Sequence, residues 1–301
     1  MRRSLVLSSI LILAAPLTLA AQAPEEPRLE WQVRLLGFHF DNFFQAPEDL
    51  PERDVEAARG EVRGSYRLRP EGTTSLFATA GFTAYREGLD DSPVAGIGLE
   101  SETERREWLL GLEHTRDQPV FDVGDELEQA DTLRFEGAWG YRVTEGWEAT
   151  LLGEWERQDF ELTPGKDNDL YSAGGAIRYR GWGYELSPEI GMDVGRRDAD
   201  DPNEDHDQQD LWLKLRSVPV PPLYVSLRYR LRTREYTVGD PLASNFGRED
   251  DRDYWTLNAR YRLTDRVALD LYYNYLDADS DKESRIFTTQ ILGLGVTFGR
   301  F

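Results

Sequence analysis

Basic side chains recur at every second position in the segment RYRLRTR, residues 228–234. Arg228, Arg230 and Arg232 alternate there with Tyr229 and Leu231. A guanidinium group is permanently charged and presents a planar set of N–H donors, so a row of such groups is suited to binding carboxylates, phosphates and other anions. No acidic residue shares the alternating positions of this segment. The pattern therefore predicts a strip that attracts anions.

Other charged residues follow the same spacing elsewhere in the chain. The basic ones are Arg59, Arg63, Arg67, Lys214, Arg216, Arg260 and Arg262, and the acidic ones are Glu148, Glu154, Glu156, Glu185, Glu189 and Asp193. Two roles fit this arrangement. The residues either form opposed basic and acidic walls of a water-filled space, or pair between neighbouring strands and stiffen a wall. Glu113, Arg134, Glu136 and Arg142 fit the second role best.

The sequence offers little for catalysis or for metal binding. Its three histidines are His39, His114 and His206, and no G-x-S-x-G motif or Ser-His arrangement accompanies them. The Asp-rich segments 198–210 and 277–283 lack the turn glycine of an EF-hand calcium loop. We therefore expect no enzyme, no cofactor and no dedicated metal site. A net charge of −21 also disfavours binding to nucleic acid.

Alternation with a period of two requires β-strands to position these groups. In residues 132–143, for example, Leu133, Phe135, Trp139 and Tyr141 share one face. We predict fourteen strands, at residues 29–40, 57–68, 73–86, 93–101, 106–116, 130–143, 147–160, 169–180, 184–197, 209–218, 223–236, 252–263, 267–276 and 285–301. Pro188 interrupts an apolar face and predicts a local bulge.

The connections between these strands alternate in length. Short turns are expected at 69–72, 102–105, 144–146, 181–183, 218–222 and 263–266, and longer acidic loops at 41–56, 87–92, 117–129, 161–168, 198–208, 237–251 and 277–284. Short turns at one end and long loops at the other are typical of a transmembrane antiparallel up-and-down β-barrel. A soluble β-sandwich would also alternate apolar and polar residues, but it would not sort its loops by length so consistently.

The N-terminus has the pattern of a secretory signal peptide. A basic start, Met1 to Arg3, precedes the apolar run from Leu5 to Leu19. Cleavage after Ala20 would leave residues 21–301 as a single barrel domain. The apolar run is short for a membrane-spanning helix, and the chain contains no cysteine. The mean hydropathy of −0.59 fits a barrel whose strands are half polar.

Together these features resemble the Gram-negative outer-membrane β-barrel proteins, and among them the porin-like channels. The resemblance rests on the signal peptide, the alternating strands and the terminal segment ILGLGVTFGRF, which ends at Phe301. In that family a terminal aromatic residue serves as an assembly signal, so the resemblance implies that the barrel-assembly machinery recognises Phe301. Phe301 is out of phase with the apolar face that ends at Phe298, which predicts either a kink near Gly299 or a strand end that has left the ladder.

The predicted function is a channel in the bacterial outer membrane for small hydrophilic, and in particular anionic, solutes. Fourteen strands about 4.8 Å apart and tilted by about 40° enclose roughly 28 Å between Cα atoms, and roughly 10 Å stay open between side chains. The few residues before the first strand are too short for a plug. The expected partners are outer-membrane lipid, lipopolysaccharide and small polar solutes, and we expect a monomer. The alternatives are the barrel component of a polysaccharide or protein export or assembly system, and a lipid-modifying enzyme.

Overall fold

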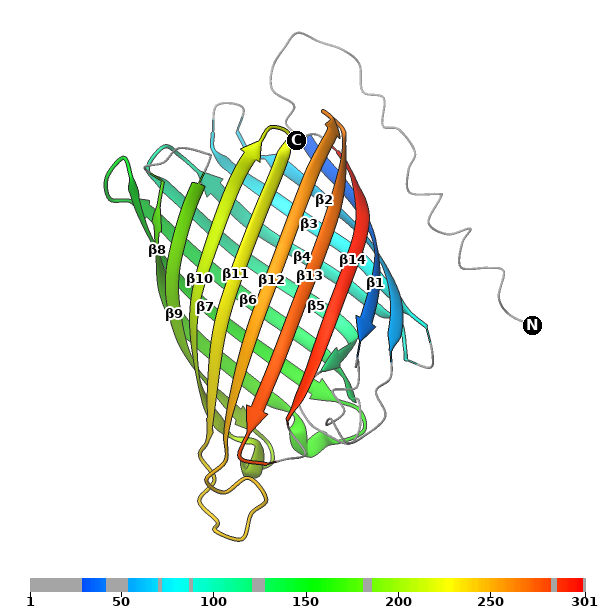
Figure 1. Cartoon of the computed structure of the whole chain (residues 1–301), viewed down its shortest axis with the longest axis vertical. Helices are drawn as coiled ribbons and strands as arrows, with labels where there is room; N and C mark the ends of the chain where they lie inside the picture. Colours follow the sequence, from blue (N-terminus) through cyan, green and yellow to red (C-terminus); the bar gives the residue numbers. More distant parts are fainter. Residues whose placement is uncertain are drawn as a thin grey trace, which may run out of the picture.

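The protein is a closed antiparallel β-barrel of fourteen strands in a computed structural model (Figure 1). The structure describes residues 29–41, 54–69, 72–86, 89–120, 128–180, 186–282 and 286–299. Each strand pairs with its neighbours in sequence, and β1 pairs with β14 to close the ring. The expected signal peptide, Glu185 and Phe301 lie outside the described residues.

Twelve of the strands contain charged residues, and most strands are longer than a bilayer requires. Their bounds are β1 Leu29–Asp41, β2 Val55–Arg67, β3 Thr74–Tyr85, β4 Ser92–Glu102, β5 Arg106–Val120, β6 Glu128–Arg142, β7 Trp147–Phe160, β8 Asn168–Tyr179, β9 Leu186–Ala199, β10 His206–Val220, β11 Leu223–Tyr236, β12 Glu249–Thr264, β13 Val267–Ser280 and β14 Phe287–Gly299. Two 3₁₀ turns, Pro164–Lys166 and Pro202–Glu204, lie in loops. Among the described residues, no helix is long and apolar enough to span a membrane.

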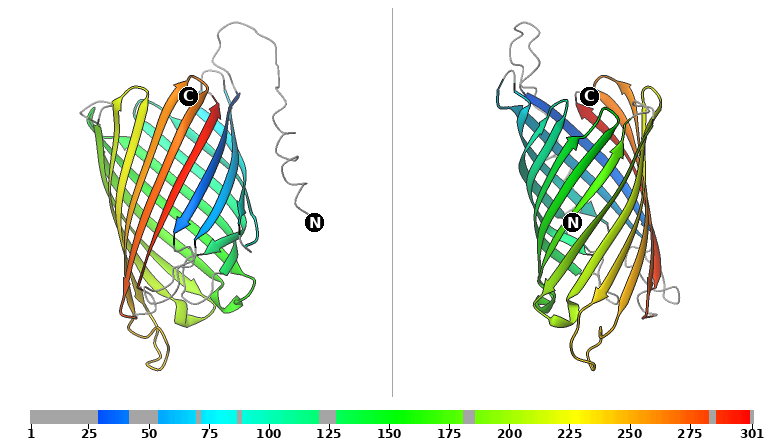
Figure 2. Two further views of the ribbon diagram at one scale, coloured as in Figure 1. Left: turned by 45° about the vertical axis from the view of Figure 1, so that its right-hand side comes forward. Right: turned by 90° about the vertical axis from the view of Figure 1, so that its left-hand side faces the viewer.

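The predicted strand count and order are confirmed, and the main difference lies at the ends of strands. The strands β5, β10, β12 and β13 continue further into the acidic loops than the alternation of apolar residues indicated. Backbone pairing needs no apolar side chains, so these ladders extend into segments whose side chains are charged on both faces. The six tight turns are all at one end, with the N-terminus of β1 and the C-terminus of β14, and we call it the short-turn end. The opposite end is the long-loop end (Figures 1 and 2).

The bulge predicted at Pro188 is wrong. The register between β9 and β10 passes through the pair Pro188–Leu215 without a shift, and the ladder to β8 ends one residue later, at Glu189. The proline therefore lies beyond the last described pair with β8, where its missing N–H costs no hydrogen bond in that ladder. Near the other end of the chain, Gly299 has a φ of +157° and still pairs with Gln32, so the strand has not left the ladder at this residue.

The outer surface of the barrel is apolar. Exposed side chains include Leu151, Ile190 and Leu213, with more than half of each side chain's surface accessible. Outward rings lie toward both ends of the strands: Trp31, Tyr66, Trp139, Trp147, Tyr261 and Phe298 nearer the short turns, and Trp155, Tyr171, Tyr229, Trp255, Tyr273 and Tyr275 nearer the long loops. An apolar band between aromatic girdles matches the hydrocarbon layer of a membrane, so the barrel spans a bilayer.

The long-loop end contains a buried polar cluster that ties three loops together. Arg248 forms a bidentate ion pair with Asp250, and their side chains are 1% and 2% exposed. Asn245 donates to the backbone oxygen of Asn203 at 2.8 Å, and Lys282 donates to the Asn245 side chain at 3.0 Å. The β11–β12 loop, residues 237–248, is thereby fixed to the loops before β10 and after β13.

Large inward side chains lie flat on the barrel wall because glycines face them on the neighbouring strand. Trp212 on β10 is opposite Gly191 on β9, and a Cβ atom at Gly191 would overlap the indole ring. Phe77 on β3 covers Gly98 on β4 in the same manner. Glycine is the one residue that permits this close approach. The arrangement keeps bulky rings beside the wall rather than across the centre of the barrel.

Candidate functional site

The candidate functional site is the charged interior of the barrel. Strand register places the described residues of the predicted set on the face opposite the exposed apolar side chains, namely Arg59, Arg63, Arg67, Glu148, Glu154, Glu156, Glu189, Asp193, Lys214, Arg216, Arg228, Arg230, Arg232, Arg260 and Arg262. The structure brings many of them into contact with charged partners on adjacent strands. It does not leave them as two separate walls of opposite charge.

Ion pairs between neighbouring strands account for a large part of the interior charge. Arg232 forms two hydrogen bonds of 2.7 Å to Asp210 on β10, so one end of the predicted anion strip is neutralised. The other pairs between neighbouring strands are Arg134–Glu154 at 2.6 Å, Arg216–Glu189 at 3.0 Å and Arg260–Asp270 at 2.7 Å. Arg63 on β2 reaches across β3 to Glu100 on β4 at 2.6 Å, and Arg59 pairs with Glu61 within β2 at 2.8 Å. Cross-strand pairing, the alternative that the sequence left open, therefore explains all of these pairs except Arg59–Glu61.

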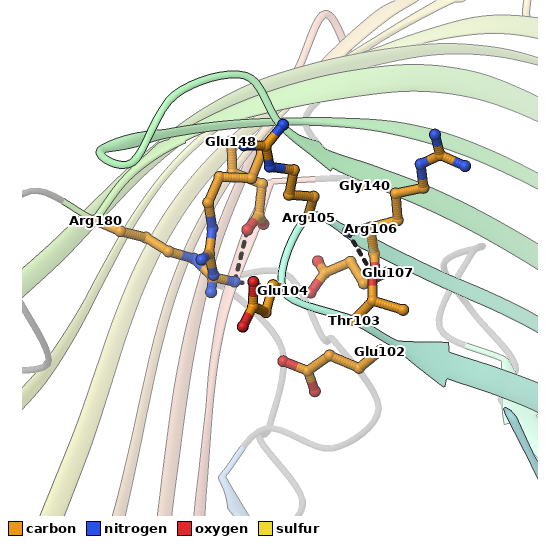
Figure 3. A pocket seen from close by; sticks show the side chains of 10 residues that line it. Glu102, Thr103, Glu104, Arg105, Arg106, Glu107, Gly140, Glu148 and Arg180 are labelled. Carbon is orange, nitrogen blue, oxygen red and sulfur yellow. Dashed lines mark hydrogen bonds and ion pairs between the residues drawn. The ribbon is translucent and has the colours of Figure 1, made fainter. Parts of the chain in front are cut away.

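A compact charge network lines the interior near the short-turn end. Glu148 is 5% exposed in its side chain and pairs with Arg178 and with Arg180, the latter at 2.7 Å. Glu107 reaches the same two arginines at 3.4 and 3.7 Å. Figure 3 shows Arg180 and Glu148 pointing toward each other beside the turn between β4 and β5. Two acids and two arginines here neutralise one another, so this network joins three strands, β5, β7 and β8, without creating a strong field.

Three basic residues at mid-depth have no acidic partner. Lys214 on β10 is opposite Arg228 on β11, and Arg230 is the next inward residue of β11. Among the described residues, none of the three forms an ion pair, and the Arg228 Nε atom is buried without a hydrogen-bond partner. We call these residues the basic cluster. Arg228 and Arg230 are the two residues of the predicted anion strip that form no ion pair with a described residue, since Arg232 pairs with Asp210.

Aromatic rings support the basic cluster. The guanidinium of Arg228 lies 5.0 Å from the centre of the Trp212 ring, and that of Arg230 lies 4.1 Å from the centre of the Tyr254 ring. A cation over an aromatic face is stabilised by the ring quadrupole. Each guanidinium is thus held against a ring, and no described residue forms a hydrogen bond or ion pair with it. Sequence reasoning missed both rings, although each shares the inward phase of neighbouring basic residues.

The wall across the barrel contains an acidic recess. Gly96 on β4 and Gly111 on β5 provide its floor, and Glu113, Arg134 and Glu136 border it. Its volume is about 80 Å³. In a ring of fourteen strands β4 lies opposite β11, so the recess faces the basic cluster. Glu113 forms no hydrogen bond or ion pair among the described residues, and the pairing expected for it is not present.

The histidines lie apart from one another. His206 is 1% exposed, packs against Tyr236 and has its Nδ1 atom 3.0 Å from the Glu204 backbone oxygen. His39 and His114 are on the outward face of β1 and β5. The described residues place no serine, histidine and carboxylate in mutual contact, so the strongest chemical feature of the site is electrostatic.

Comparison with known proteins supports the fold. No family model matches the sequence, and no curated protein matches it. Among solved structures, the anion-selective porin from Comamonas acidovorans is similar with a TM-score of 0.50 and 9% identity, covering 90% of this chain and 99% of that chain. OmpT, an outer membrane protein of Vibrio cholerae, is similar with a TM-score of 0.51 and 8% identity, covering 93% and 100%. The architecture of this chain is thus that of a bacterial outer-membrane β-barrel.

Proposed function

We propose that this protein is a diffusion channel of the bacterial outer membrane for small hydrophilic solutes, with a preference for anions. The observation that carries the proposal is the basic cluster at mid-depth. Lys214, Arg228 and Arg230 contribute three positive charges with which no described carboxylate forms an ion pair. Positive groups in a confined aqueous space raise the local concentration of anions and lower that of cations.

The shape of the wall also supports a channel. Trp212 is only 3% exposed because it lies against Gly191, and the paired arginines are held beside the wall by their carboxylates. A fourteen-strand barrel is intermediate between eight-strand barrels, which side chains fill, and sixteen-strand barrels, which contain an aqueous channel. Because the interior side chains lie flat against the wall, a barrel of this size is expected to contain an aqueous channel.

Conductance and ion selectivity test the proposal. The purified protein, refolded in detergent and inserted into a planar bilayer, is expected to produce steady single-channel currents. In a KCl gradient the reversal potential should have the sign of chloride preference. A barrel that inserts fully but conducts no current would overturn the channel proposal. A channel that prefers potassium would overturn the assignment of the basic cluster.

A further inference from the structure

An apolar arc lies beside the basic cluster on the interior wall, where a simple aqueous channel needs none. We define the arc as Leu36, Phe38, Phe40, Tyr272 and Ile291, which register places inward on β1, β13 and β14. The Phe38 ring contacts Phe40 at 5.9 Å and meets Tyr272 edge-on at 6.1 Å between ring centres. These three rings are only partly buried, so part of their surface faces the interior.

Strand register relates the arc to the basic cluster. The strands β11, β12, β13, β14 and β1 are consecutive in the closed ring. Arg228 on β11 is level with Thr256 on β12 and Asn274 on β13, and Tyr272 is the next inward residue of β13 after Asn274. Two strand spacings, or roughly 10 Å, separate the backbones of β11 and β13. This separation is comparable to the length of one small molecule.

One polar pair lies between them. Thr256 on β12 donates to the Oδ1 atom of Asn274 on β13 at 2.8 Å. Phe38 lies over Gly293, where a Cβ atom would come within 2.7 Å of the ring, and the ring is thereby held against the wall. A mostly apolar surface with a few convergent charged donors is the usual composition of a small-molecule binding site.

We propose that the interior binds amphipathic carboxylates, solutes that carry an aromatic or alicyclic ring beside a carboxylate. The carboxylate contacts the N–H edges of Arg228 and Arg230, and the ring contacts Tyr272 and Phe38. This inference rests on the proposed channel function and goes beyond its preference for anions. Each half of the site contributes something that the other does not: the basic cluster selects charge, and the arc retains the apolar part of the solute.

Three matched probes test the proposal in planar bilayers. Phenylacetate has ring and carboxylate, acetate has the carboxylate alone, and phenylacetamide has the ring alone. Phenylacetate is expected to interrupt the KCl current at a concentration at least about tenfold lower than either of the others, because two contacts act together. Equal concentrations for phenylacetate and acetate would overturn the inference while leaving anion selectivity intact. Loss of all current would instead contradict the channel itself.

Variants of the arc separate binding from a change in pore width. The substitutions Phe38→Ala and Tyr272→Leu should each weaken the block by phenylacetate about three- to tenfold without affecting acetate. Leu152→Ala is the control, because Leu152 is inward on β7 across the barrel. The KCl conductance of each variant shows whether it has folded, and Tyr272→Leu keeps a large apolar side chain at its position so that assembly is retained. Equal weakening by Leu152→Ala would overturn the assignment.

Discussion

The substitution Arg230→Gln tests the electrostatic role of the basic cluster most directly. It removes one positive charge that has no described acidic partner, and its glutamine is long enough to remain over the Tyr254 ring. No ion pair is broken, so no buried acid is left behind. We therefore expect the barrel to assemble normally and the change to appear in ion selectivity.

The size of the effect follows from Coulomb's law. A chloride ion passing about 5 Å from one guanidinium in water is stabilised by about 0.8 kcal/mol. At 0.1 M salt the Debye length is about 10 Å, which reduces the interaction to about 0.5 kcal/mol. Since 1.4 kcal/mol corresponds to a factor of ten, one charge enriches anions about twofold and depletes cations about twofold. Arg230→Gln should therefore lower the chloride-to-potassium permeability ratio about fivefold.

Reversal potentials across a KCl gradient measure this ratio, and two further variants serve as controls. Arg230→Lys keeps the charge and should retain the selectivity. The double substitution Glu189→Gln with Arg216→Gln removes an ion pair of 3.0 Å and leaves the net charge unchanged, so its effect should be small. If Arg230→Gln has the same permeability ratio as the parent protein, or if the neutral double variant shifts it equally, the reasoning from unpaired charge is refuted.

Three other substitutions test the wall, the loops and the outer face. Gly191→Ala should reduce single-channel conductance, because a Cβ atom there overlaps the Trp212 ring and moves it toward the centre of the barrel. Asp250→Asn should leave Arg248 buried without its ion pair, at a cost of about 3–5 kcal/mol, and limited proteolysis should then cut the β11–β12 loop faster. Leu213→Arg, on the outward face, should destabilise the folded barrel by about 2–4 kcal/mol in denaturant titrations with lipid vesicles.

Each of these substitutions has a matched control in the chain. Gly37→Ala adds a methyl group where no atom lies within 4 Å, so conductance should not change. Asp251→Asn alters an exposed carboxylate next to the buried one, and the loop should remain resistant to protease. Leu242→Arg lies at a loop tip that is 93% exposed and should leave stability unchanged. If a control variant shows the same effect as its partner, the stated contact is not the cause of that effect.

The barrel could be predicted from the sequence because its physical causes are local. Alternation of apolar and polar residues assigns each side chain to a face, and the outward row Leu223, Val225, Leu227, Tyr229 and Leu231 is where that rule placed it. Loop lengths then distinguish the two ends. Pro188 was misjudged because its effect depends on whether a neighbour strand still pairs there, which no local pattern reports.

The interior was only partly predictable because pairing depends on the neighbouring strand. Alternation identified Arg232 as an inward cation, but Asp210 becomes its partner only through the register of β10 against β11. The apolar arc was missed for a different reason. In β1, Phe38 and Phe40 are inward and apolar while the outward residues are also largely apolar, so the two faces differ too little for the pattern to separate them.

The basic cluster persists without acids because the wall supplies another form of stabilisation. Gly191 allows Trp212 to lie flat, and the flat ring then offers its face to Arg228. An acidic partner would hold the guanidinium equally well, but it would cancel the charge and occupy the N–H edge. A ring instead takes the face of the cation and leaves both its charge and its donors available. The glycine thus has two effects at once, since it keeps the centre of the barrel clear and permits a positive charge to remain unpaired beside it.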